Sequence, residues 1–158
     1  MRARDLAEDF PTVTLTSDAM DAARAMASAH KPGLIVLDHR GRPHAVLGGS
    51  QVLRFVIPSY IQDDPQLARA LADDAADELC RRLEGRSVRD VLPKPQDRDE
   101  LPVVDGDATA LEMAAVMARM HSPLVAVLED DTVIGAVTVP RLLDYLLPSS
   151  PTTAAATP

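Results

Sequence analysis

The spacing of apolar and polar positions in the first third of the chain predicts a strand, a helix, a β-hairpin and a second, short helix. Residues 12–15 suit a short strand, and the next apolar residues recur three and four positions apart, as on one helix face. That face is formed by Met20, Ala23, Met26 and Ala27. Pro32 ends the helix. The apolar runs 34–37 and 45–47 then predict the hairpin, and residues 51–56 the short helix.

The same order of elements returns in the last third of the chain. Val103 and Val104 predict a strand, the runs 125–128 and 133–137 a hairpin, and residues 141–147 a closing helix. The long helix between them has an apolar face formed by Leu111, Ala114, Ala115, Met117 and Ala118. Each unit is therefore expected to be β-α-β-β-α. Six side chains of the two long helices are expected to be buried: Met20, Ala23, Met26, Leu111, Ala114 and Met117.

The two units also share sequence. The pattern M-A-x-x-H-x-P begins at Met26 and again at Met117, 91 positions later. A unit that leaves an apolar face uncovered usually packs on its copy, so we expect two repeats related by a pseudo-two-fold axis. The expected organisation is a first repeat over 1–58, a connecting helix over 59–86, a second repeat over 87–147 and a disordered tail over 148–158.

The segment between the repeats has an apolar stripe of its own. Its members recur every four residues: Leu67, Leu71, Ala75, Leu79 and Leu83. Acidic residues come early in the segment and basic residues late, an order that suits the helix dipole. The pattern predicts one helix. Two roles stay open for it: a connector packed along the pair of repeats, or a docking surface for a second subunit or another partner.

Composition and charge exclude several classes of protein. With 46% hydrophobic residues among 158, the chain can build an aliphatic core, and its formal charge of −8 disfavours nucleic acid, which requires a basic surface. No apolar stretch approaches the roughly 20 residues of a membrane-spanning helix, and no secretory signal is present. We therefore expect a cytoplasmic protein without direct membrane insertion. Cys80 is the single cysteine, so no internal disulfide can form.

The duplicated β-α-β-β-α order and one further motif resemble a known family. The stretch G-A-V-T-V-P-R-L, from Gly135 to Leu142, follows the pattern G-x-h-T-x-x-x-L, where h is hydrophobic, and the first repeat has a weaker version. This is similar to the CBS domain. The resemblance implies an α+β fold of tandem CBS domains, called a Bateman module, without enzymatic activity. It also implies a homodimer that senses AMP, ATP or S-adenosylmethionine between its repeats and regulates a separate enzyme or membrane transporter.

The chain departs from the family at the ligand site. Nucleotide-binding members carry Thr or Ser followed three residues later by an Asp that holds the ribose hydroxyls. Here Thr138 is followed by Arg141, and Gly48 by Gln51. Because an Arg side chain can only donate hydrogen bonds, we expect a ligand with negative charge. The predicted ligand-binding residues are Gly48, Gly49, Gln51, Thr138 and Arg141.

Two alternatives to this ligand site and its chemistry remain open. In the first, the protein is a ligand-free homodimeric scaffold in which Arg141 pairs with an acid such as Asp144 and the cleft is filled. In the second, His30 and His121 form a matched metal pair, although helix capping explains both better, because each lies at a helix end. No arrangement of nucleophile and base is recognisable, so we expect neither a catalytic site nor a metal site.

Overall fold

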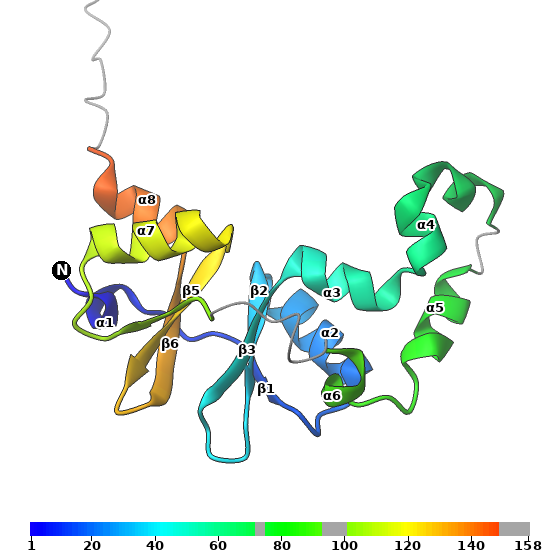
Figure 1. Ribbon diagram of the computed structural model, residues 1–158, viewed down its shortest axis with the longest axis horizontal. Helices are drawn as coiled ribbons and strands as arrows, with labels where there is room; N and C mark the ends of the chain where they lie inside the picture. Colours follow the sequence, from blue (N-terminus) through cyan, green and yellow to red (C-terminus); the bar gives the residue numbers. More distant parts are fainter. Residues whose placement is uncertain (72–74, 93–100, 149–158) are drawn as a thin grey trace, which may run out of the picture.

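Two three-stranded sheets with flanking helices form the protein, and a computed structural model describes residues 1–71, 75–92 and 101–148. The first repeat contains β1 (Thr12–Thr14), α2 (Ala19–Ala29), β2 (Gly33–Leu37), β3 (Pro43–Gly48) and α3 (Gly49–Val56). In its sheet, the central strand β2 pairs in parallel with β1 and antiparallel with β3. The helices α2 and α3 lie together beside this sheet (Figure 1).

The second repeat has the same order and the same pairing. It contains β4 (Val103–Asp105), α7 (Ala110–Met120), β5 (Leu124–Glu129), β6 (Thr132–Thr138) and α8 (Val139–Leu146). Its central strand β5 pairs in parallel with β4 and antiparallel with β6. The predicted α+β class and the duplicated β-α-β-β-α order are confirmed. The strand and short-helix boundaries differ from the predicted ones by at most two residues.

The ends of the two long helices are set by equivalent residues. The Asp18 carboxylate accepts hydrogen bonds from two backbone N–H groups of the first turn of α2, at 2.9 and 3.1 Å. In α7 the Thr109 hydroxyl accepts from the Glu112 N–H. Both helices end at a histidine in the left-handed conformation, His30 and His121, each with φ of 51°. The prediction that these histidines cap helix ends is therefore confirmed in position.

Two short helices tie the repeats together by exchange. Helix α1 (Ala3–Leu6) packs on the second repeat, where the Ala3 N–H donates to the Ala108 carbonyl at 2.9 Å. Helix α6 (Val88–Val91) packs on the first repeat, where the Val88 N–H donates to the Ser17 carbonyl at 2.8 Å. Each repeat is thus completed by a short helix that precedes the other repeat in the sequence.

A small core joins the two sheets directly. Side chains of Ile35 and Val46 from the first repeat pack there with side chains of the second repeat, namely Leu124, Ala126 and Ala136. All five are at least nine-tenths buried. The expectation that the repeats pack on each other is therefore met at the sheets.

The faces that α2 and α7 bury differ from the faces predicted from the sequence. In α7 the buried side chains are Ala110, Met113 and Met117, whereas Leu111 is 74% exposed. In α2 the corresponding buried residues are Ala19 and Ala22, while Met20, Ala23 and Met26 are half-buried and Ala27 is exposed. Ala114 is also half-buried, and Ala115 and Ala118 are exposed. Both helices are apolar on more than one side, so periodicity alone could not select the packed face.

The segment between the repeats is not one helix, which corrects the prediction. It contains α4 (Ser59–Asp63), a 3₁₀ helix η1 (Pro65–Ala70) and α5 (Ala75–Leu83). Pro65 has no N–H to continue α4, and the Asp64 side chain starts η1 by accepting from the Gln66 N–H. Of the predicted stripe, Leu83 is buried, whereas Leu67 and Leu71 are 45% and 43% exposed. The side chains of Ala75 and Leu79 lie outside the described part.

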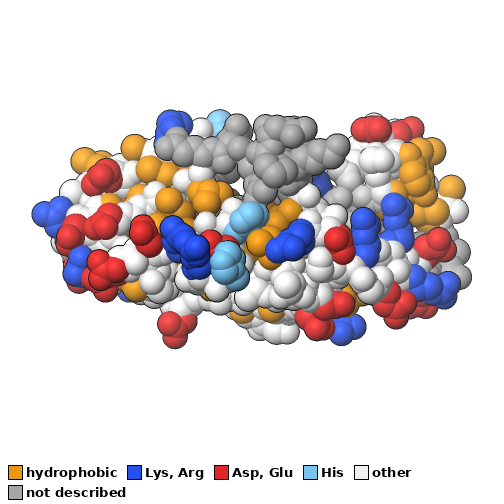
Figure 2. Space-filling view, turned by 60° about the horizontal axis from the view of Figure 1, so that its bottom comes forward, with side chains coloured by type: hydrophobic (Ala, Val, Ile, Leu, Met, Phe, Trp, Pro, Cys, Tyr) orange, Lys and Arg blue, Asp and Glu red, His pale blue; other side chains and the backbone are white. Residues whose placement is uncertain are grey.

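Hydrophobic side chains are visible both at the end of the molecule that carries α4 and α5 and over the opposite end, and at both ends basic and acidic side chains lie beside them (Figure 2). Within the described residues, no helix combines the length and apolar character needed to cross a membrane. Residues 149–158, which hold most of the predicted disordered tail, lie outside the described part.

Candidate functional site

The strand-to-helix turns of the two repeats are built alike. At the first turn, the Gly49 N–H donates to the Pro32 carbonyl at 2.9 Å. At the second, the Val139 N–H donates to the Pro123 carbonyl at 3.1 Å. Each turn is thereby bonded to the proline that immediately precedes the central strand of its own sheet. The second bond fixes the turn that follows Thr138, the last residue of β6.

The first N–H groups of both helices are already used. Val139 is bonded as described, and Pro140 has no N–H, so α8 presents few free donors at its start. At α3 the Gln51 side-chain oxygen accepts from the Gly48 N–H at 2.8 Å, closing the turn on itself. An anion at this junction would therefore be bound mainly by side chains and not by a cradle of helix N–H groups.

A pocket of about 450 Å³ opens between the repeats beside Thr138. It is lined by His30, Lys31, Pro32, Pro123, Thr138, Val139 and Pro140. The first three residues follow α2 in the first repeat, and the others belong to the second. Small-molecule sites commonly have volumes of roughly 300–1,000 Å³, so this pocket has the size for a metabolite.

Only part of the predicted ligand site meets at this pocket. Thr138, 9% exposed, lines it, and Arg141 lies one turn further along α8 with its side chain 44% exposed. Gly48 instead packs against the second repeat, because an added Cβ would lie 3.2 Å from Pro123 Cγ. Neither Gly49 nor Gln51 lines the pocket. Of the five predicted residues, Thr138 alone lines this pocket, with Arg141 close to it on α8, and the three residues of the first repeat are not part of the lining.

Two charged residues were missed from the sequence: Lys31, which lines the pocket, and Glu8, which pairs with it. Glu8 Oε1 lies 3.9 Å from Arg141 Nε, and Glu8 Oε2 lies 3.8 Å from Lys31 Nζ. The ion-pair partner of Arg141 among the described residues is therefore Glu8, from the connection between α1 and β1, and not Asp144. Lys31 could have been noticed, because it lies between the histidine and the proline of the repeated M-A-x-x-H-x-P pattern, where the second copy has the uncharged Ser122. No sequence signal pointed to Glu8.

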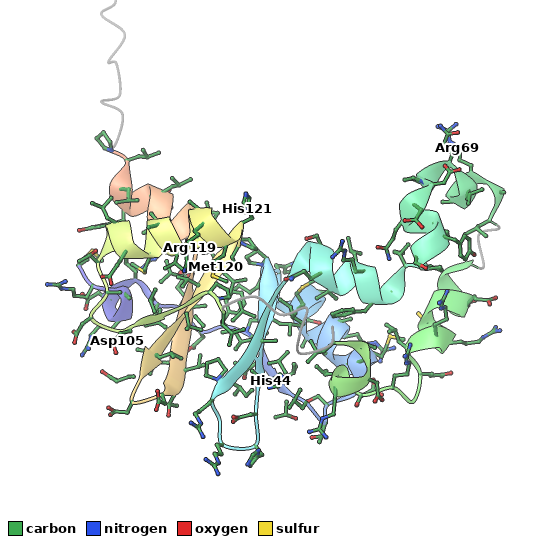
Figure 3. All side chains as sticks on the ribbon, in the orientation of Figure 1. His44, Arg69, Asp105, Arg119, Met120 and His121 are labelled. Carbon is green, nitrogen blue, oxygen red and sulfur yellow. The ribbon has the colours of Figure 1, made fainter. Side chains whose placement is uncertain are left out.

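The histidines lie near the pocket but form no metal cluster. His30 lines it, and His121 stands where α7 ends, at the junction of the repeats (Figure 3). Among the described residues, no group of three or more His, Cys, Asp or Glu side chains could hold a metal ion. Gly would take the left-handed conformation at both helix ends with less strain, and no contact in the described residues explains why histidine stands there.

Two other cavities are less suited to a ligand. One, between α2, α3 and α5, has an almost wholly apolar lining and a volume of about 20 Å³, which is room for about one water molecule. The other, of about 250 Å³, runs along Asp9, Phe10 and Thr12 against residues 133–135 of β6. Asp9 and Phe10 belong to the same α1–β1 connection as Glu8.

Comparison with known proteins identifies the family. The profile of the CBS domain matches residues 88–148, and no curated protein matches the chain. A CBS domain-containing protein of unknown function from Kribbella flavida is 50% identical over 92% of this chain and 97% of its own, with a TM-score of 0.77. The CBS domain of a CBS domain containing membrane protein from Sphaerobacter thermophilus is 23% identical, covering 93% of this chain and 88% of its own, with a TM-score of 0.69.

A third solved structure shares the fold and carries a ligand. CBSX2, in complex with AMP, is 17% identical, covering 91% of this chain and 94% of its own, with a TM-score of 0.61. At this identity the likeness concerns the fold alone. The duplicated topology, the second-repeat match and the 50% identity over nearly all of the Kribbella protein agree. On these grounds the chain belongs to the CBS domain family, as a pair of CBS repeats in one polypeptide.

Proposed function

We propose that this protein is a regulatory module that binds a small anionic or adenosyl metabolite between its repeats and modulates a separate partner protein. The observation that carries the proposal is the 450 Å³ pocket, whose walls come from both repeats. A ligand that touches both repeats binds best to one arrangement of them and shifts the population toward it. A partner that contacts the outer helices can read that shift without any chemical step.

The charges at the pocket support a ligand with negative charge. Lys31 and Arg141 contribute two cations from opposite repeats, against the one carboxylate of Glu8. Arg141 offers a planar fork of donors suited to phosphate or carboxylate. AMP, ATP and S-adenosylmethionine are the ligands to test, and the AMP complex of CBSX2 supports the adenosyl class through the shared fold. A second site at Gly48, Gly49 and Gln51 remains a prediction.

The assembly and the partner are proposed from the family. A homodimer is supported by apolar side chains that both repeats leave exposed on their outer helices, such as Leu53 and Leu143. We propose that the regulated protein is a separate enzyme or a membrane transporter, and that the module acting on it is cytoplasmic and non-enzymatic.

Two contacts favour the alternative, a scaffold that binds no ligand. Arg141 has an internal partner in Glu8, and the Gly48 turn is packed against Pro123, so part of the cleft is filled by the chain itself. A scaffold would keep these contacts permanently. The open pocket beside Thr138 argues against complete filling, which is why the ligand-binding function is preferred.

Calorimetric titration of the wild type with AMP, ATP and S-adenosylmethionine tests the proposal. Arg141→Gln should weaken binding of the preferred ligand by at least about tenfold, the usual worth of a charged hydrogen bond. Arg24→Gln is a matched control, because Arg24 is also an exposed arginine with a carboxylate 3.9 Å away, that of Asp21 on α2. If none of the three ligands binds, the scaffold is the better account. Tight binding that Arg141→Gln leaves unchanged would place the site elsewhere.

A further inference from the structure

Two cations from opposite repeats share a single carboxylate at the edge of the pocket. Lys31 follows α2 in the first repeat and lines the pocket, and Arg141 lies in the first turn of α8 in the second repeat. The two oxygens of Glu8 divide between them, with distances of 3.8 Å to Lys31 Nζ and 3.9 Å to Arg141 Nε. The three side chains therefore carry a net charge of +1 within a small volume.

The main chain of Glu8 is fixed, whereas its carboxylate is free to move. Its N–H donates to the Ala136 carbonyl at 2.9 Å, and its carbonyl accepts from the Ala136 N–H at 3.0 Å. These bonds hold Glu8 at the edge of β6 whichever way its side chain points. The Glu8 side chain is 40% exposed, and both of its ion pairs are long. Such pairs contribute little to stability and are readily exchanged.

We propose that Lys31 and Arg141 form an anion subsite, and that the Glu8 carboxylate occupies it as an internal counter-ion until a ligand's phosphate or carboxylate replaces it. This rests on the function proposed for the same pocket and deepens it. A phosphate has more oxygens than a carboxylate and can accept from both cations with short, charge-assisted hydrogen bonds. Displacement of Glu8 therefore favours ligands with negative charge over neutral ones.

The exchange also couples ligand binding to the arrangement of the repeats. A ligand anion held by Lys31 and Arg141 joins the first repeat to the second through the ligand itself. Glu8 joins them in the empty protein through the α1–β1 connection. Glu8 thus sets a threshold, because a ligand must compete with a carboxylate whose local concentration is fixed by the fold.

Removal of the Glu8 charge tests the subsite without removing either cation. Glu8→Gln is compared with wild type by calorimetric titration with inorganic phosphate and with AMP at low ionic strength, where exposed charges are least screened. We expect about three- to tenfold tighter binding of both probes, the range that two weak ion pairs allow. Adding Arg141→Gln to Glu8→Gln should abolish that gain.

Glu129→Gln is the matched control. Glu129 is a half-exposed glutamate with an arginine partner, Arg4 at 3.1 Å, and it lies at the end of β5 away from Pro123 and the pocket. The Glu129→Gln substitution removes the same charge from the whole protein and should leave the affinities for phosphate and for AMP unchanged. An equal gain in Glu129→Gln would assign the effect to net charge and overturn the subsite.

The remaining outcomes separate this inference from the function it rests on. Equal or weaker binding of phosphate and AMP by Glu8→Gln overturns the counter-ion role, even if the wild type binds AMP and the proposed function stands. Absence of phosphate binding to both proteins also overturns the subsite. If Glu8→Gln gains phosphate affinity while AMP, ATP and S-adenosylmethionine all fail to bind the wild type, the subsite stands and the proposed ligands are wrong.

Discussion

Gly135 of β6 lies directly against the backbone of Glu8, so that a Cβ at position 135 would stand 2.6 Å from the Glu8 carbonyl oxygen. The two hydrogen bonds between Glu8 and Ala136 require this approach. The glycine of the G-x-h-T motif thus has a steric reason, because it admits the α1–β1 connection to the edge of the second sheet. The same contact delivers the Glu8 side chain to Lys31 and Arg141.

Gly135→Ala should destabilise the protein by about 1–3 kcal/mol, the usual cost of forcing an extra carbon into a packed site. Urea denaturation followed by circular dichroism measures it. Gly49→Ala is the control, because its added carbon would meet Pro32 O at 3.6 Å and Met26 Cε at 3.9 Å, which are ordinary contacts. That change should be neutral or stabilise by up to about 1 kcal/mol. Equal midpoints for the two variants would contradict the steric argument.

The order of elements could be predicted because each element has its own apolar period and its own terminator. Pro32 and Pro123 stop helices, and short apolar runs bounded by polar turns read as strands. The face of α7 could not be predicted, since Ala110-Met113-Met117 and Leu111-Ala114-Ala118 fit a helical period equally well. The single central helix was an avoidable error, because Asp64-Pro65 is a signal that starts a new helix.

The candidate site could be predicted only where it depends on local sequence. Thr138 and Arg141 follow from the strand-to-helix motif, and of these two Thr138 lines the pocket, while Arg141 pairs with Glu8 beside it. Glu8 could not be predicted, since it reaches the pocket only because α1 packs on the second repeat. That exchange joins residues more than 100 positions apart and leaves no periodic trace in the sequence.

The corrected helix face makes a direct prediction about two neighbouring positions. Met113 is fully buried in the core of the second repeat, so Met113→Ala should cost about 2–5 kcal/mol of unfolding free energy. Leu111 is 74% exposed, so Leu111→Ala should change stability by no more than about 0.5 kcal/mol. Both are measured by chemical denaturation at a protein concentration where the assembly state is known. If Leu111→Ala lost more unfolding free energy than Met113→Ala, the helix face predicted from periodicity would be the buried one.

The β2–β3 turn should contribute a pH-dependent part of the stability. Backbone N–H groups of Arg42 and then Arg40, with the nearby Arg42 charge, lower the pKa of Asp38 from its usual 3.8. The folded protein therefore binds this proton less readily than the unfolded chain. The stabilisation is present above pH 3.8 and is lost as pH falls through the folded pKa.

Asp38→Asn keeps an acceptor in the turn but removes the titrating group. Its melting temperature should fall less steeply than that of the wild type as the pH is lowered from about 5 to 2, in the direction that linkage requires. Thermal denaturation across that range measures the two slopes. Asp90, whose pKa is lowered mainly by the Ser87 N–H, provides a second test through Asp90→Asn. Parallel curves for wild type and both variants would show that neither carboxylate contributes.

Equivalent positions in the two repeats leave a leucine exposed on the outer helices. Val52 of α3 and Leu142 of α8 are buried, and the residues that follow them, Leu53 and Leu143, are 60% and 44% exposed. A homodimer that covers both positions would explain why neither is polar, because a leucine side chain lowers the free energy only when it is removed from water. We expect the protein to sediment as a dimer at tens of micromolar.

Leu143→Arg should shift the sedimentation velocity profile toward monomer, since an arginine buried without a partner opposes association. The fold should survive, because the side chain is half-exposed in the single chain, and circular dichroism checks this. Leu67→Arg is the informative comparison, since Leu67 is similarly exposed but lies on the segment between the repeats. Dissociation by Leu67→Arg alone would move the dimer contact to that segment and give it the docking role left open by its apolar stripe. A wild type that is monomeric at every concentration would reject the dimer, and the exposed leucines of α3 and α8 would then need another partner.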